Sequence, residues 1–462
     1  MKISSIILLL VTGGLVSCTT PVSPPQKRSE VPAAENWTAA ESFAGPAVDT
    51  WLFMHRDPRL MALINEAWQH NRELRVAAAN LTAAAAQARI AGADRLPSLT
   101  GSGGAQRGRD IPGGATSDGY SAGLNLAWEL DLWGRLADST RAAEATYAAS
   151  ESDYAAARLS LAGQVARLWH DLIAARARLE LNEETARNLR DNQRIVERRY
   201  DAGLRSALDL RLARTNALTA ESDAAGARRS VAALARALEI MVGRYPANSI
   251  AVEHALPDVE GIPAVGLPAE MIARRPDLLA ATARYEAAAL SAGAARKLRL
   301  PQFTLTGNAT SATGQLENLF SSDTGIWSLA GGLTAPLFQG GRIAGGVDTA
   351  EALERAALER YAERLLAAVG EVETALAAET LLAEQADLLE DVVAEADASE
   401  ELAWNQYREG VVELTTVLEA QRRAFNSKRD LINLQNDRLR NRVALLLALG
   451  ISPQATDAAP EI

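Results

Sequence analysis

The stretch Trp128-Glu-Leu-Asp-Leu-Trp-Gly-Arg135 joins two different periodicities of the chain. Before it, residues 120–132 alternate between apolar and polar side chains, which is typical of a strand with one apolar face. After it, apolar and small residues recur every three or four positions as far as Tyr200, which indicates a long helix packed along a seam. The sequence therefore predicts a strand that passes directly into a long helix.

The same joint occurs twice. Leu130-Asp-Leu-Trp-Gly-Arg135 corresponds to Leu337-Phe-Gln-Gly-Gly-Arg342, and Tyr200-Asp-Ala-Gly203 corresponds to Tyr407-Arg-Glu-Gly410, in both cases 207 positions later (342 − 135 and 410 − 203). Internal repeats of this kind indicate a supersecondary unit that is used more than once. We therefore expect two copies with the same plan: an Ala-rich helix ended by Leu-Pro, two strands, a long helix, a turn at glycine and a returning helix.

The repeat sets the expected domain boundaries. They are repeat 1 at 57–243, with strands at 98–106 and 120–132 and a helical hairpin at 134–243; a linker at 244–269; repeat 2 at 270–450, with strands at 303–312 and 327–338 and a hairpin at 341–450; and a tail at 451–462.

The long helices carry a heptad pattern. Apolar or small residues are spaced alternately by four and three positions from Leu161 to Tyr200 and from Ala368 to Tyr407. A sustained period of 3.5 residues predicts a left-handed coiled coil. A helix over 136–201 would extend about 95 Å at ~1.5 Å per residue. A coiled-coil scaffold in the periplasm would show the same pattern, so the helices alone do not establish the function.

The strands are about as long as a membrane-spanning strand, and each has one apolar and one polar face. This pattern suits a transmembrane barrel with a wet interior, although amphipathic sheets of soluble domains also show it. Four strands do not close a barrel, and an open sheet edge in lipid leaves backbone groups unpaired at several kcal/mol each. If the strands span a membrane, several chains must contribute to one barrel.

The N-terminus has the features of a secretory signal: Lys2, a short apolar run and small residues. Residues 1–17 are expected to be the signal peptide, because Leu15-Val-Ser-Cys18 resembles the bacterial lipoprotein lipobox, in which the cysteine is acylated. Residues 18–56 would then form a lipidated tether. A plain signal peptide that contains a cysteine remains the alternative.

Composition excludes several classes of protein. Lys plus Arg number 47 and Asp plus Glu 58, so the net charge is −11, which is unsuited to nucleic acid binding. A single cysteine and four distant histidines offer no disulfide framework and no metal site, and no cofactor is expected. Gly119-Tyr-Ser-Ala-Gly123 fits the G-x-S-x-G pattern of hydrolases, but it leads into a strand rather than a strand-to-helix turn. We therefore expect no enzyme, with a secreted hydrolase using Ser121 as the competing hypothesis.

The combined motifs resemble the TolC-like outer membrane efflux factors, in particular their lipid-anchored, NodT-type multidrug branch. The resemblance covers about 50–450 and rests on Trp128–Arg135, Arg274-Arg-Pro-Asp277, Pro336–Arg342 and Tyr407–Gly410 with Val417-Leu-Glu-Ala-Gln421. The chain departs from the family pattern at Ala281-Thr282, where Ala-Glu is usual, and at Thr416, where Asp is frequent.

The resemblance implies a mainly α fold with transmembrane β-structure. Three chains would form a twelve-stranded outer-membrane barrel, four strands from each, continuous with a periplasmic α-helical tunnel. The function implied is passive export of small molecules such as drugs across the outer membrane of a Gram-negative bacterium. The partners would be a periplasmic membrane-fusion adaptor and an inner-membrane pump, of the resistance-nodulation-division type. The alternatives are the outer membrane component of a type I protein secretion system and a non-pore scaffold.

The resemblance also assigns residues. Cys18 would carry the lipid. The adaptor-docking hairpin tips would be Gly203, Leu204, Arg205, Ser206, Gly410, Val411 and Val412. The tunnel constriction would be formed by Asp209, Thr416 and Glu419. A ring of carboxylates would attract cations. The alternative for Asp209 is a structural role as a negative charge at a helix N-terminus. The alternative for Glu419 is a position on a solvated helix face without a role in the tunnel.

Overall fold

The computed structural model of the chain describes residues 37–40, 57–109, 111–252, 255–259 and 265–453. The expected signal peptide, Cys18 and most of the tether lie outside these residues. The chain forms two compact units. The strand unit contains 79–152 and 278–364, and the hairpin unit contains the described parts of 32–78, 153–277 and 365–462.

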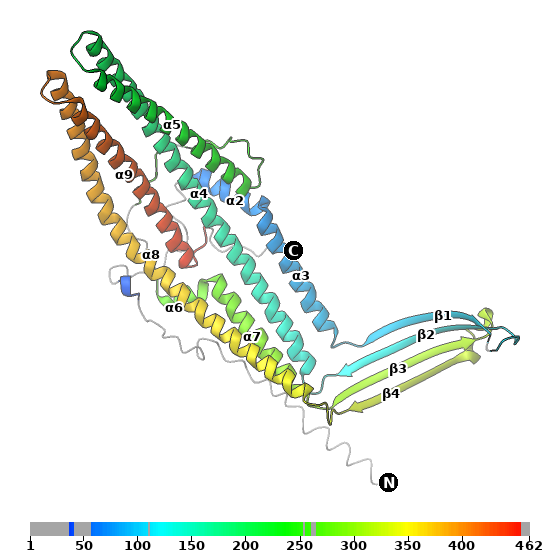
Figure 1. Cartoon of the computed structure of the whole chain (residues 1–462). Helices are drawn as coiled ribbons and strands as arrows, with labels where there is room; N and C mark the ends of the chain where they lie inside the picture. Colours follow the sequence, from blue (N-terminus) through cyan, green and yellow to red (C-terminus); the bar gives the residue numbers. More distant parts are fainter. Residues whose placement is uncertain (1–36, 41–56, 110, 253–254, 260–264, 454–462) are drawn as a thin grey trace. The chain divides into compact units, whose positions relative to one another are not determined.

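The strand unit holds a single four-stranded antiparallel sheet in the order β1-β2-β3-β4 (Figure 1). The strands are β1 (Ser98–Gly108), β2 (Ser117–Leu130), β3 (Gln302–Thr313) and β4 (Gly325–Thr334). Each strand pairs with its neighbour in sequence, so the second repeat continues the sheet begun by the first. The mainly helical fold with four antiparallel strands is confirmed.

The register gives the sheet one apolar and one polar face. Leu124 lies opposite Gly101 and Ala309, whereas Asn125 lies opposite Thr100 and Asn308. The Asn308 side-chain amide donates to the Asn125 side-chain oxygen at 2.8 Å, which links two strands on the polar face. Within the described residues, β1 and β4 each pair along one edge only. The sheet is therefore open at both sides.

Two strands end earlier than the sequence predicted. The fourth was expected to reach 338 but ends at Thr334, because Pro336 has no N–H to donate to a ladder. The second was expected to reach 132 but ends at Leu130, since Leu132 turns back to donate to the Leu130 carbonyl. The first strand begins at Ser98 as expected, and the other strand ends differ from the expected ranges by one to three residues.

The strand-to-helix joint is fixed by side chains of the Trp128–Arg135 motif. The Asp131 carboxylate accepts from the backbone N–H groups of Leu136 at 3.1 Å and Ala137 at 2.7 Å, so it serves the free N–H groups at the start of helix α4 (Arg135–Asp201). Arg135 closes back on the Glu129 carboxylate with two bonds of 2.8 Å. The strand and the helix are thus locked together locally.

The hairpin unit contains the greater part of two long antiparallel helical hairpins, whose first helices begin in the strand unit. The first is formed by α4 with α5 (Ala207–Met241), and the second by α8 (Arg342–Glu409) with α9 (Leu414–Ala448). The two turns lie at the same end of this unit (Figure 1). Much of the predicted heptad seam is buried, including Leu161, Val165, Leu172, Val372 and Tyr407.

Each returning helix is met at its C-terminus by a helix from the start of its repeat. The opening helices are α3 (Arg72–Ala93) and α7 (Pro276–Lys297), preceded by two short helices that the sequence did not predict, α2 (Pro58–His70) and α6 (Pro268–Arg274). The Asn71 side chain donates to the Met241 carbonyl at 2.9 Å, and Arg275 donates to the Ala448 carbonyl at 2.8 Å. These equivalent contacts satisfy carbonyls that a helix end leaves free.

One buried titratable side chain of the hairpin unit, His170, is uncharged at neutral pH. His170 is 2% exposed, and burial lowers its pKa to about 4 although Asp57 and Asp171 act in the opposite direction. The imidazole is therefore neutral at pH 7 and belongs to the packing. Among the described residues, no helix has the length and apolarity needed to cross a bilayer.

Candidate functional site: the ends of the helical hairpins

Both hairpin turns end a long helix with the same backbone motif. Gly203 has φ of 73° and Gly410 has φ of 81°, a left-handed conformation that favours glycine. The N–H of Leu204 donates to the Arg199 carbonyl at 2.8 Å, and that of Val411 to the Gln406 carbonyl at 2.9 Å. These bonds span the last helical turn as in a Schellman motif.

The seven predicted tip residues are not equivalent. Leu204 and Val411 are 71% and 68% exposed, an unusual condition for large apolar side chains at a turn. Gly203, Ser206 and Gly410 are also exposed. Arg205 and Val412 are half-buried and take part in packing. Each turn therefore exposes a large apolar side chain, Leu204 at the first and Val411 at the second.

The returning helix of the first hairpin begins with a complete capping box. Ser206 Oγ accepts from the Asp209 N–H at 3.1 Å, and the Asp209 carboxylate accepts from the Ser206 N–H at 3.2 Å. This arrangement supports the interpretation of Asp209 as a helix N-terminal charge, since its carboxylate already has a structural role in the capping box. The second hairpin has Glu413 at the equivalent place, without a side-chain capping bond.

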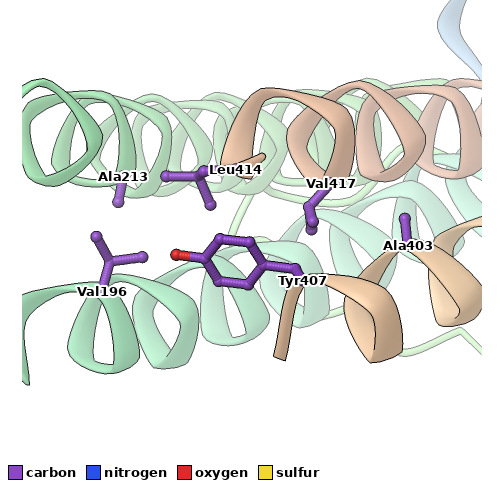
Figure 2. Close-up of a cluster of buried hydrophobic side chains, with 6 residues drawn as sticks. All are labelled: Val196, Ala213, Ala403, Tyr407, Leu414 and Val417. Atoms are coloured by element: carbon purple, nitrogen blue, oxygen red, sulfur yellow. The ribbon is translucent and has the colours of Figure 1, made fainter. Parts of the chain in front are cut away.

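A buried cluster ties the ends of all four long helices together. It consists of Val196, Ala213, Ala403, Tyr407, Leu414 and Val417, drawn in Figure 2. Tyr407 is fully buried and points its hydroxyl towards Val196 of α4, beneath Ala213 and Leu414 (Figure 2). The cluster crosses from one hairpin to the other just behind the turns.

The Tyr407 ring also contacts two arginine side chains and one tryptophan ring. The guanidinium groups of Arg199 and Arg205 lie 5.1 and 4.6 Å from its ring centroid, within the range of a cation–π interaction. Trp404 meets the ring edge-on at 5.6 Å. Arg199 additionally donates to the carbonyl of Arg408 at 3.1 Å, near the C-terminal end of α8. The buried Tyr407 hydroxyl has no hydrogen-bond partner among the described residues.

The three predicted constriction residues lie at the start of the returning helices. Glu419 accepts from Arg422 at 2.8–3.1 Å and from Arg423 at 3.1 Å, one turn further along α9. These bonds lower the pKa of Glu419, so its carboxylate stays ionised to lower pH than usual. Thr416 is exposed, and its N–H donates to the Glu413 carbonyl at 3.1 Å.

The group around Glu419 therefore has a local charge of +1, because one carboxylate is accompanied by two guanidinium groups. Sequence reasoning considered Glu419 as a lone carboxylate and omitted both arginines, although their spacing of three and four residues is the one that brings helix side chains together. It placed Tyr407 and its repeat equivalent Tyr200 alike on the heptad seams. Tyr407 is fully buried, whereas Tyr200 is 40% exposed, and the heptad pattern does not distinguish the two.

The competing hypothesis, that Ser121 is the nucleophile of a hydrolase, has no structural support. Ser121 lies inside β2, opposite Gly104 and Ala312, rather than at a strand-to-helix turn. Among the described residues no group of three or more His, Cys, Asp or Glu side chains is placed to hold a metal ion.

Comparison with known proteins gives consistent matches over nearly the whole chain. The family model described as outer membrane efflux protein matches residues 63–244 and 267–451. The chain is 32% identical to the solvent efflux pump outer membrane protein SrpC of Pseudomonas putida, with 96% of each chain covered. It is 30% identical to the cation efflux system protein CusC of Escherichia coli K12, with 94% of this chain and 96% of that one covered.

A solved structure agrees with the fold. The open state of the Neisseria gonorrhoeae MtrE outer membrane channel superposes with a TM-score of 0.82 at 29% identity, covering 95% of this chain and 99% of that chain.

Replacing Tyr407 by Phe is expected to keep or raise thermal stability, because it removes a buried hydroxyl without a partner, worth about 1–3 kcal/mol when unsatisfied. Tyr407→Ala is expected to cost about 3–5 kcal/mol, since it empties the cluster. Thermal unfolding followed by circular dichroism measures both. Tyr200→Phe, at the exposed equivalent position, is the matched control and should change stability by less than about 0.5 kcal/mol. If Tyr407→Phe lost as much stability as Tyr407→Ala, the conclusion that the Tyr407 hydroxyl has no hydrogen-bond partner would be wrong.

Proposed function

Because this chain belongs to the outer membrane efflux protein family and is the outer membrane channel of an efflux system in a Gram-negative bacterium, we propose that three copies assemble into one passive duct. The observation that carries the proposal is the open sheet. Its four strands have one apolar and one polar face, and the outer edges of β1 and β4 are unpaired among the residues that the structure describes. Pairing β4 of one copy with β1 of the next would close a twelve-stranded barrel around a polar interior.

The hairpins would line a periplasmic tunnel that continues the duct. The sequence has no phosphate-binding motif, so the energy for export would come from a partner in the inner membrane. We propose a pump of the resistance-nodulation-division type, reached through a periplasmic adaptor. The names of two relatives refer to solvent and to cation efflux. This range supports small molecules as the class of cargo, with the pump selecting among them.

The constriction is proposed to lie at the start of the returning helices, where Glu419, Arg422 and Arg423 form a charged group. Replacing Glu419 by Gln removes one negative charge from each chain and leaves both arginines. In planar bilayers we expect discrete conductance from the wild type. In the variant, the ratio of anion to cation permeability should rise by roughly twofold to fivefold, the range for one exposed charge per chain.

The same experiment includes a pH test and a control. The arginines depress the pKa of Glu419, so wild-type selectivity should stay constant as the pH falls from 7 to 4.5, where an unpaired glutamate would be half protonated. Glu413→Gln removes an exposed carboxylate that makes no capping bond at the start of the same helix, and should leave selectivity nearly unchanged. If the two variants changed selectivity equally, Glu419 would not be a constriction residue. If the wild type gave no conductance, this would argue against a duct.

The hairpin tips are proposed to dock on the adaptor through Leu204 and Val411, the exposed apolar residues at the two turns. Changing either to Asp should weaken adaptor binding by about tenfold or more, because apolar anchors carry much of the energy of such contacts. Binding of purified adaptor to the channel in detergent measures the effect. Tyr245→Asp is the control, since Tyr245 is 85% exposed and distant in sequence from either turn. Unchanged binding in both tip variants would place the docking surface elsewhere.

The lipid anchor is proposed at Cys18, the only cysteine of the chain. Cells grown with labelled palmitate should incorporate the label into the wild-type protein and not into Cys18→Ser. Label retained in that variant would show that the lipid, if any, is attached elsewhere.

A further inference from the structure

The four long helices of the hairpin unit form a row, and side-chain contacts establish its order. Arg228 of α5 pairs with Glu183 of α4 at 2.8 Å. The guanidinium of Arg178 on α4 donates to Asn433 of α9 at 2.6 Å, and Asn436 of α9 donates to Asp171 of α4 at 2.7 Å.

The row is completed by the contacts of α9 with α8. Lys428 pairs with Asp397 at 2.9 Å, and Arg442 pairs with Glu379 at 2.8 Å. Away from the turns the order is therefore α5-α4-α9-α8, with α5 and α8 at the two ends (Figure 1). Just behind the turns α8 also contacts α4, through Tyr407 and Val196. The outer faces of these two helices are the sides on which a neighbour would be placed.

The outer face of α5 carries a basic stripe. Arg211, Leu218, Ala225, Arg229 and Arg236 follow one another at intervals of 7, 7, 4 and 7 residues, which keeps them on one side of a helix. All five are exposed, Leu218 to 59%. The guanidinium groups of Arg211 and Arg229 make no hydrogen bond or ion pair with the described residues. No acidic residue occupies this stripe.

The outer face of α8 is acidic. Residues 384–401 contain eight carboxylates and no Lys or Arg. Glu384, Asp387, Asp391 and Glu395 lie on the side that is turned away from α9, and all four are exposed without an ion-pair partner among the described residues. They border the apolar side chains of Leu388 and Val392, which are 61% and 51% exposed. Leu402, 56% exposed, continues the strip two helical turns beyond Glu395. An apolar strip bordered by unpaired charges of one sign is typical of an interface that lacks its partner.

We propose that the acidic face of α8 packs against the basic stripe of α5 in the next copy of this chain, and that this charge match selects the direction of assembly. The proposal rests on the trimeric duct proposed above and specifies the contact between its subunits. Each copy offers one face of each sign at opposite ends of the row, so the contact is heterologous and closes as a ring. The reverse contacts, α5 on α5 or α8 on α8, would place like charges together.

The position of the turns indicates which residues meet. Both hairpin turns lie at the same end of the hairpin unit (Figure 1), so positions equally distant from the turns are taken as level across the interface. Arg229 is 22 residues from the start of α5 (229 − 207), and Asp387 is 22 residues from the end of α8 (409 − 387). Both are then about 33 Å from the turns at ~1.5 Å per residue. Asp391 is one helical turn from Asp387, so Arg229 faces two carboxylates.

Disulfide crosslinking tests the contact directly. Ala225 and Val392 lie at nearly equal height, 18 and 17 residues from the turns (225 − 207 and 409 − 392). The Ala225→Cys, Val392→Cys double variant should form covalent dimers and trimers on mild oxidation of the full-length protein. Because Cys18 is the only native cysteine, each single variant controls for its contribution. A wild-type trimer whose double variant does not crosslink would overturn the proposed contact and leave the duct intact.

Charge reversal tests the role of electrostatics. Arg229→Glu should shift the equilibrium between monomer and trimer about tenfold towards monomer, because each of three interfaces then opposes like charges. Adding Asp387→Arg and Asp391→Arg to the same chain should restore the trimer. Native mass spectrometry across a concentration series measures the fractions.

Glu390→Arg is the matched control, because Glu390 is exposed on the same helix but is rotated about 100° from Asp391. It should leave the trimer unchanged. If Arg229→Glu has no effect, or if the added arginines do not rescue it, the charge match does not direct assembly. If the wild type forms neither trimers nor conducting pores, the proposed function fails and the interface fails with it.

Discussion

The hydrogen-bonding groups at the outer edges of β1 and β4 are the constraint on which the structure depends. A backbone N–H or C=O without a partner costs several kcal/mol in a bilayer, so a four-stranded sheet with free edges is unsuited to exist there alone. The sheet has two faces of opposite character, as the Leu124 and Asn125 positions show. A single chain is thus an incomplete barrel, and its fold already requires other copies.

The strand-to-helix joint makes this requirement extend to the helices. Asp131 caps α4 within a few residues of the end of β2, and Arg135 pairs with Glu129 across the same corner. A strand and a helix that are joined so tightly cannot be arranged independently. The number of copies that closes the sheet is therefore also the number of helical rows in the tunnel, and the outer faces of α5 and α8 must be compatible with that number.

The order of elements could be predicted from the sequence because it depends on local patterns: a period of two for strands, a 3.5-residue period for the long helices, and glycine at each turn. Prediction was less accurate where contacts between residues distant in sequence, or the end of a periodic pattern, determine where a helix or strand stops. The short helices α2 and α6 are separated from α3 and α7 at Asn71 and Arg275, whose partners lie at Met241 and Ala448. The ion pairs of Glu419 with Arg422 and Arg423 are a different case, because these residues are only three and four positions away and the sequence could have indicated them.

The two repeats share a plan but close their hairpins by different means. The first turn is completed by its own capping box at Ser206 and Asp209, and its tyrosine, Tyr200, is largely free of the core. The second has no side-chain cap at Glu413, and instead buries Tyr407 against Val196 of the first hairpin beneath two guanidinium groups. The first turn is therefore stabilised locally, whereas the second depends on its neighbour within the chain. Any displacement of one hairpin relative to the other must disturb the contacts of Tyr407, so this cluster resists independent movement of the two tips.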